Sequence, residues 1–155
     1  MATLVGAAAC QRKDAEPATA APAQAGAAPE SAAAEDEAPS PMQKALAAAG
    51  RPVTRAATQV SPEQLAVTQA RSGELLDVTG TPLRVGLLRY ESPAVAAKAL
   101  QQVVLWINGS GLLHNGEATA RGDTVIVVGT IADETPTDET RALFDRYIDA
   151  FLEAK

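Results

Sequence analysis

The apolar and polar positions of this chain divide it into two contrasting parts. Residues 11–41 contain no Val, Ile, Leu, Met, Phe, Tyr or Trp, whereas large apolar side chains recur at strand and helix spacing from Met42 onward. A segment without core-forming residues cannot offset the entropy lost on ordering. We therefore expect a single folded domain over residues 42–155, a length typical of one domain.

Two segments near the middle of the chain have the pattern of paired strands. Leu75–Thr79 and Leu83–Tyr90 are separated by Gly80-Thr81-Pro82, which favours a turn. Because alternate strand positions point to opposite faces, one face of the second strand is apolar, carrying Leu83, Val85 and Leu87. We expect the other face to be mostly solvated, as in many antiparallel sheets; it carries Arg84, Gly86 and Leu88.

A second pair of strands is predicted over Leu112–Arg121 and Thr124–Ile131, with the turn at Gly122-Asp123. Asn115-Gly116 within the first of them indicates a β-bulge or an earlier tight turn. The second strand contains the most hydrophobic run of the chain, Val125–Val128. We therefore expect that strand to lie centrally in the sheet.

Serine followed by proline predicts two helix starts, at Ser61-Pro62 and Ser92-Pro93. The first helix should run to about Arg71. The second should run to Asn108 as the main core helix, with an apolar stripe of Ala96, Leu100, Val103, Val104 and Ile107. A third should start near Thr135-Pro136 or Thr137-Asp138, and Gln43–Ala49 has the length of one or two helical turns. Arg51–Val60 has no regular pattern.

These elements predict an α+β fold. We expect a small four-stranded, mostly antiparallel sheet with two to three helices packed on one face.

The segment from Gln11 to Pro41 has the composition of a linker. It holds twelve Ala, five Pro and six acidic residues, and its prolines interrupt each run that alanine would favour as helix. We expect residues 10–41 to form a disordered, partly extended linker behind Cys10. The linker has a net charge of −4, so most of the chain's net charge of −6 lies there. The domain is left near neutral, without the charge excess typical of nucleic-acid binding.

Cys10 is the only cysteine, and small residues Ala7-Ala8-Ala9 precede it. This segment resembles the end of a bacterial lipoprotein signal peptide. The resemblance implies that residues 1–9 are a truncated signal-peptide-like segment, that lipid is attached to the Cys10 sulfur, and that acyl chains hold the protein at a membrane.

A signal peptide opens with basic residues, and none precedes Cys10. We therefore expect the start of the precursor to lie upstream. Gln11 follows the cysteine, and by the sorting rule of the lipoprotein family this favours the outer membrane, with the protein facing the periplasm. A soluble protein with a disordered N-terminal tail is the alternative.

The residues that could carry chemistry do not form a catalytic pattern. His114 is the only histidine and Cys10 is far from it in sequence, so we expect no metal site. No nucleophile elbow or phosphate-binding glycine motif is present. We predict that the protein is not an enzyme and takes no cofactor.

Aromatic residues are scarce, and three of them are candidates for partner binding: Trp106, Tyr90 and Tyr147. Trp106 lies beside the apolar stripe of its helix, which fits either a core position or an exposed anchor, since tryptophan is enriched at interface hot spots. The sequence thus predicts a lipid-anchored binding or assembly module of the cell envelope with a possible protein partner. The alternative is a periplasmic small-ligand carrier or enzyme. Its site would lie on the sheet face opposite the helices, around His114 with Arg84, Arg89 or Arg121.

Overall fold

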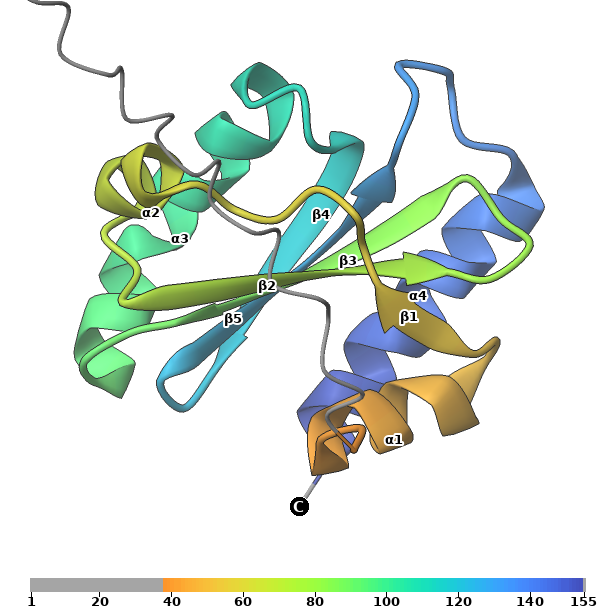
Figure 1. Cartoon of the computed structure of the whole chain (residues 1–155), viewed down its shortest axis with the longest axis horizontal. Coiled ribbons are helices and arrows are strands. Elements are labelled where there is room, and N and C mark those ends of the chain that lie inside the picture. The colour runs from red at the N-terminus through yellow and green to blue at the C-terminus, as the bar shows by residue number, and fades with distance from the viewer. Residues whose placement is uncertain (1–37, 155) are drawn as a thin grey trace, which may run out of the picture. The chain divides into compact units, whose positions relative to one another are not determined.

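A computed structural model describes residues 38–154, which form four helices and five strands (Figure 1). The expectations for residues 1–9, for Cys10 and for the linker up to residue 37 lie outside the described residues. In chain order the elements are α1 (Pro41–Ala49), β1 (Val53–Arg55), α2 (Pro62–Thr68), β2 (Ser72–Val78), β3 (Leu83–Arg89), α3 (Pro93–Gly109), β4 (His114–Arg121), β5 (Thr124–Thr130) and α4 (Asp138–Glu153).

All five strands belong to one antiparallel sheet with the order β1-β2-β3-β5-β4. The α+β class and the antiparallel pairing are confirmed, while the predicted numbers of four strands and two to three helices are too small. The missed strand is β1, in the segment that we expected to be irregular. Its three residues pair with β2 from Val53↔Val78 to Arg55↔Leu76, and two of the three are exposed.

Three helices begin with a serine-proline pair: the two predicted starts at Ser61 and Ser92, and a third at Ser40 that was not predicted. Ser40, Ser61 and Ser92 each accept a hydrogen bond on the side-chain oxygen from a backbone N–H in the first turn. In α1 and α2 the glutamine at the third position also accepts a bond from the cap residue's N–H, which completes a capping box. Of the two starts predicted for the last helix, the structure has the second, with Thr137 as cap.

The prediction that the helices pack on one face of the sheet is wrong. Helices α1 and α4 cover one face, over a core that includes Leu46, Val85, Phe144 and Tyr147. Helices α2 and α3 cover the other face, over a second core, and Figure 1 shows the two helix pairs on either side of the sheet. The reason lies in β3, where the face expected to be solvated is buried: Arg84, Gly86 and Leu88 are all covered.

The β4–β5 hairpin follows its prediction closely. Gly122 has φ of +59° in the turn, and Val125–Val128 are fully buried between β3 and β4. The predicted irregularity in β4 is a bulge, since the register shifts between His114 and Glu117. Asn115 adopts a positive φ of +48° there, a conformation that asparagine tolerates better than most residues.

No helix within residues 38–154 is long and apolar enough to cross a membrane.

Candidate binding surface

The three aromatic residues predicted to bind a partner are buried. Tyr90, Trp106 and Tyr147 are 3%, 6% and 0% exposed. Tyr147 belongs to the core beneath α1 and α4, whereas Tyr90 and Trp106 belong to the core on the opposite face. The sheet therefore separates Tyr147 from Tyr90 and Trp106, so the three residues do not form one patch.

Tyr147 links α4 to the segment after α1. Its hydroxyl donates to the Arg51 carbonyl oxygen at 2.8 Å and accepts from the Arg51 N–H at 2.9 Å. Burial raises the pKa of Tyr147, while the hydrogen bond and the charge of Arg51 act in the opposite direction. A buried hydroxyl with both a donor and an acceptor partner has a structural role here.

Tyr90 and Trp106 differ from Tyr147 in that no described residue meets hydrogen-bond geometry with their polar atoms, although the Thr68 side chain lies near the Tyr90 hydroxyl. Neither the Tyr90 hydroxyl nor the Trp106 indole nitrogen Nε1 has a partner among the described residues. Burial raises the pKa of Tyr90 to about 12, and the nearby Thr68 hydroxyl opposes that rise. Such buried unpaired groups are uncommon and each costs stability.

Trp106 nevertheless borders an apolar hollow between α2 and α3, of about 370 Å³. Val67 of α2 and Leu105 of α3 stand at this hollow with 53% and 68% of their surface exposed. The remaining lining residues are uncharged: Gln64, Gln102, Gly109 and Ser110. Val104, expected in the core stripe, is also exposed, because the helix turns Ala99 and Trp106 inward instead.

Val67 and Leu105 were not predicted as binding residues. The sequence does contain an indication of this surface, because Leu105 is a large aliphatic residue outside the apolar stripe of its helix. Such a position is exposed unless another element covers it. In this fold α2 stands beside α3 without covering Leu105, so the two helices frame the hollow.

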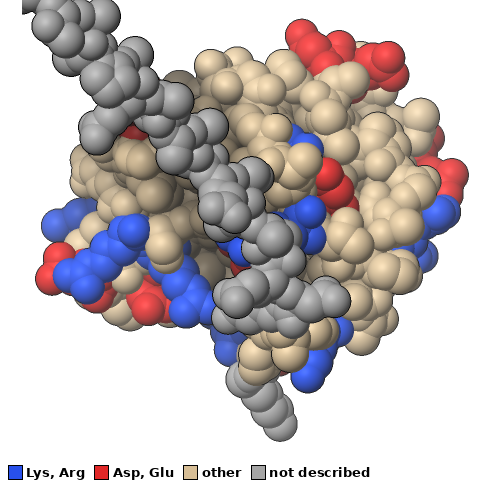
Figure 2. All heavy atoms as spheres, in the orientation of Figure 1, with Lys and Arg blue, Asp and Glu red and all other residues tan. Residues whose placement is uncertain are grey.

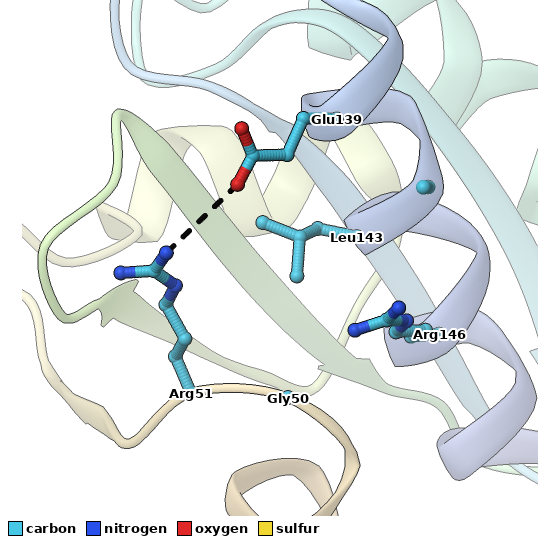
Figure 3. Close-up of a pocket in the computed structure, with 6 residues that line it drawn as sticks. Gly50, Arg51, Glu139, Leu143 and Arg146 are labelled. Atoms are coloured by element: carbon cyan, nitrogen blue, oxygen red, sulfur yellow. Dashed lines mark ion pairs between the residues drawn. The ribbon is translucent and has the colours of Figure 1, made fainter.

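A second hollow, of about 190 Å³, lies between α4 and the segment after α1. It is more polar, and Figure 3 shows Arg51, Glu139, Leu143 and Arg146 around it. A guanidinium nitrogen of Arg51 lies 4.0 Å from a carboxylate oxygen of Glu139, and both side chains are exposed. Neither arginine was predicted as a site residue.

Three of the four residues proposed for the enzyme or carrier alternative have other contacts, and the fourth, Arg89, is exposed at the end of β3. Arg84 pairs with Asp77 at 2.6 Å and donates to the Leu112 carbonyl, and Arg121 donates to the Phe151 carbonyl at 2.7 Å. His114 lies 4.0 Å from the exposed Asp133. This alternative required an open sheet face, whereas within residues 38–154 helices cover both faces of the sheet.

Charged side chains are mixed over the visible face of the molecule. Figure 2 shows basic and acidic groups interspersed, with acidic groups at the upper right and basic groups toward the lower left. Within residues 38–154, no cluster of three or more His, Cys, Asp or Glu residues is arranged to hold a metal ion.

Comparison of the chain with protein-family models, with curated proteins and with solved structures found no match.

Proposed function

We propose that this protein is a lipid-anchored component of the bacterial cell envelope whose folded domain is a binding module. Its partner is an uncharged, apolar segment of another envelope protein. The observation that carries the proposal is the hollow between α2 and α3, where Val67 and Leu105 are exposed beside Trp106.

The lining of this hollow favours a peptide over a charged ligand. None of its seven residues carries a charge, so a charged group would lose hydration without gaining a counter-ion. The apolar side chains can contact an aliphatic or aromatic side chain of the partner. The amides of Gln64 and Gln102 supply donors and acceptors of the kind that pair with peptide groups.

The anchor part of the proposal rests on Cys10 and on the linker composition. A domain held by acyl chains on a linker of about thirty residues can search the volume near a membrane, because a flexible chain of that length spans roughly 30 Å. Tethering raises the effective concentration of the module for partners in the same membrane. A binding surface of low affinity, such as the α2–α3 hollow, is then sufficient to bind the partner protein.

Crosslinking of the tethered protein in native envelopes tests the binding surface. We expect the major crosslinked peptide to map to the hollow. Its yield should fall strongly in the double variant Val67→Ser, Leu105→Ser. The matched control is Ile131→Ser, which also removes an exposed apolar side chain, 40% exposed, but outside the hollow. An equal loss in both variants, or crosslinks confined to other faces, would contradict the proposed surface.

Fatty-acid labelling tests the anchor separately. The wild-type precursor should incorporate label and Cys10→Ser should not. Label that persists in Cys10→Ser would contradict attachment at Cys10, and label absent from both proteins would favour a soluble protein with an N-terminal tail.

A further inference from the structure

The hollow beside α4 is lined by more basic than acidic side chains. Arg51 and Arg146 both line it, against the single carboxylate of Glu139. Within residues 38–154, Arg146 has no ion pair, and Arg51 has only the 4.0 Å contact with Glu139. An exposed pair at that distance contributes little, so both guanidinium groups remain able to bind an anion.

The backbone holds the two arginines around one space. Glu139, Leu143 and Arg146 follow each other at helical spacing on one side of α4. Arg51 comes from the segment after α1, and the two hydrogen bonds from Tyr147 fix its backbone. Figure 3 shows the Leu143 side chain between the Arg51 and Arg146 side chains.

Two of the side chains that line the hollow are apolar, and a glycine also lies at its edge. Ala142 and Leu143 line it from α4. A Cβ atom at Gly50 would stand 3.3 Å from the Tyr147 hydroxyl oxygen and 3.6 Å from a Leu143 methyl carbon. Glycine at this position therefore lets the backbone lie close to Tyr147 and Leu143, and the apolar contacts for a ligand come from Ala142 and Leu143.

We infer that this hollow binds a carboxylate that bears a short aliphatic group, such as the end of a peptide or a small organic acid. The planar guanidinium matches a carboxylate in shape and forms charge-assisted hydrogen bonds with it. A ligand carboxylate would take the place of Glu139 as the partner of Arg51. Arg146 would approach it from the other side.

The surroundings favour a single negative charge over a phosphate dianion. Glu139 stands at the rim, and α1 ends at Ala49 beside the hollow. The last carbonyl groups of a helix carry partial negative charge. Both features repel a second negative charge on the ligand, and the two arginines repel cations.

Titration of the full chain with N-acetylalanine, followed by NMR at constant ionic strength, tests this site. The amide signals of Gly50 and Arg51 should shift and saturate. N-acetylalaninamide has the same shape without the charge and should cause no saturable shift. Saturable binding of inorganic phosphate at these residues, without binding of N-acetylalanine, would overturn the assignment to a carboxylate.

Three variants separate the site from general charge effects. Arg146→Gln should weaken N-acetylalanine binding about fivefold or more, because a charge-assisted contact is lost. Glu139→Gln should strengthen it about threefold, because the competing carboxylate and its repulsion are removed. Arg141→Gln, an exposed position of α4 outside the hollow, should leave affinity unchanged. If Arg141→Gln weakens binding as much as Arg146→Gln does, or if no signal saturates, the inference fails.

Discussion

The hydroxyl of Tyr147 both donates to and accepts from the backbone of Arg51, a residue 96 positions earlier in the chain. The pair joins α4 to the end of α1 and satisfies a hydroxyl that is fully buried. It also sets the position from which Arg51 reaches the neighbouring hollow.

Tyr147→Phe should therefore destabilise the domain. Two hydrogen bonds are lost and the Arg51 backbone groups lose their partner, which amounts to about 2 kcal/mol of unfolding free energy. Urea denaturation measures the change. Tyr90→Phe is the matched control, because its hydroxyl is buried without a hydrogen-bond partner among the described residues. Its stability should stay the same or rise by up to about 1 kcal/mol, and a loss equal to that of Tyr147→Phe would contradict the assignment.

Tyr90 should make stability depend on pH in the alkaline range. Burial raises its pKa from 10.0 to about 12 in the folded protein, so the folded state holds this proton more tightly than the unfolded state. The contribution is fully present below pH 10, falls as pH rises from 10 to about 12, and then levels off. Two pKa units correspond to a loss of about 3 kcal/mol.

Urea denaturation across that pH interval, compared between wild type and Tyr90→Phe, isolates this contribution, since the other basic and tyrosine groups are common to both. The difference in stability between the two proteins should change steadily in favour of the variant. A constant difference would show that Tyr90 ionises equally in both states.

The ion pair between Arg84 and Asp77 should matter more than a typical surface pair. Its Nε–Oδ1 distance is 2.6 Å, and the two side chains are 11% and 35% exposed. Asp77→Asn removes the counter-charge of a mostly buried guanidinium, although the amide oxygen and the Leu112 carbonyl can still accept hydrogen bonds, at a cost of about 1–2 kcal/mol. The pair Arg71–Glu91 is short, at 3.0 Å, but both side chains are mostly exposed. Glu91→Gln should therefore change the free energy of unfolding by less than about 0.5 kcal/mol. Denaturant unfolding measures both variants. Equal losses of stability would contradict the importance of burial for the Arg84–Asp77 pair.

Gly116 should not tolerate a side chain. An added Cβ would lie 2.8 Å from the Val128 carbonyl oxygen and 2.9 Å from a methyl carbon of Ile107, so Gly116→Ala should cost about 2 kcal/mol through overpacking. Gly109, at the end of α3, has no atom within 4 Å of an added Cβ. Gly109→Ala should be neutral or slightly stabilising because alanine favours helix. Thermal unfolding distinguishes the two, and similar midpoints would contradict the close packing at the bulge.

Much of the local structure was predictable because its causes are local. The serine-proline starts, the capping boxes, the Gly122 turn and the bulge at Asn115-Gly116 all depend on neighbouring residues. Strand β1 was not predictable in this way. Its three residues have no pattern of their own, and they form a strand because β2 presents an edge for them.

The candidate sites were the least predictable part. Trp106, Tyr90 and Tyr147 were chosen because large aromatics favour interfaces, yet in this domain they supply the two cores. Val67 and Leu105 come from different helices, and Arg51 and Arg146 are separated by most of the domain. Only packing brings either pair to one hollow.

By itself the sequence determined which segments become the helices and the four longer strands, that the sheet is antiparallel, and that β5 lies in its interior. These depend on periodicity, caps and turns. The tertiary structure decided that helices cover both faces of the sheet. Arg84 can be buried on the second face because Asp77 on the adjacent strand pairs with it, and Gly86 lets Leu75 and Leu113 pack closely there. A charged residue and a glycine indicate exposure when read along the chain, and only their neighbours across the sheet allow burial.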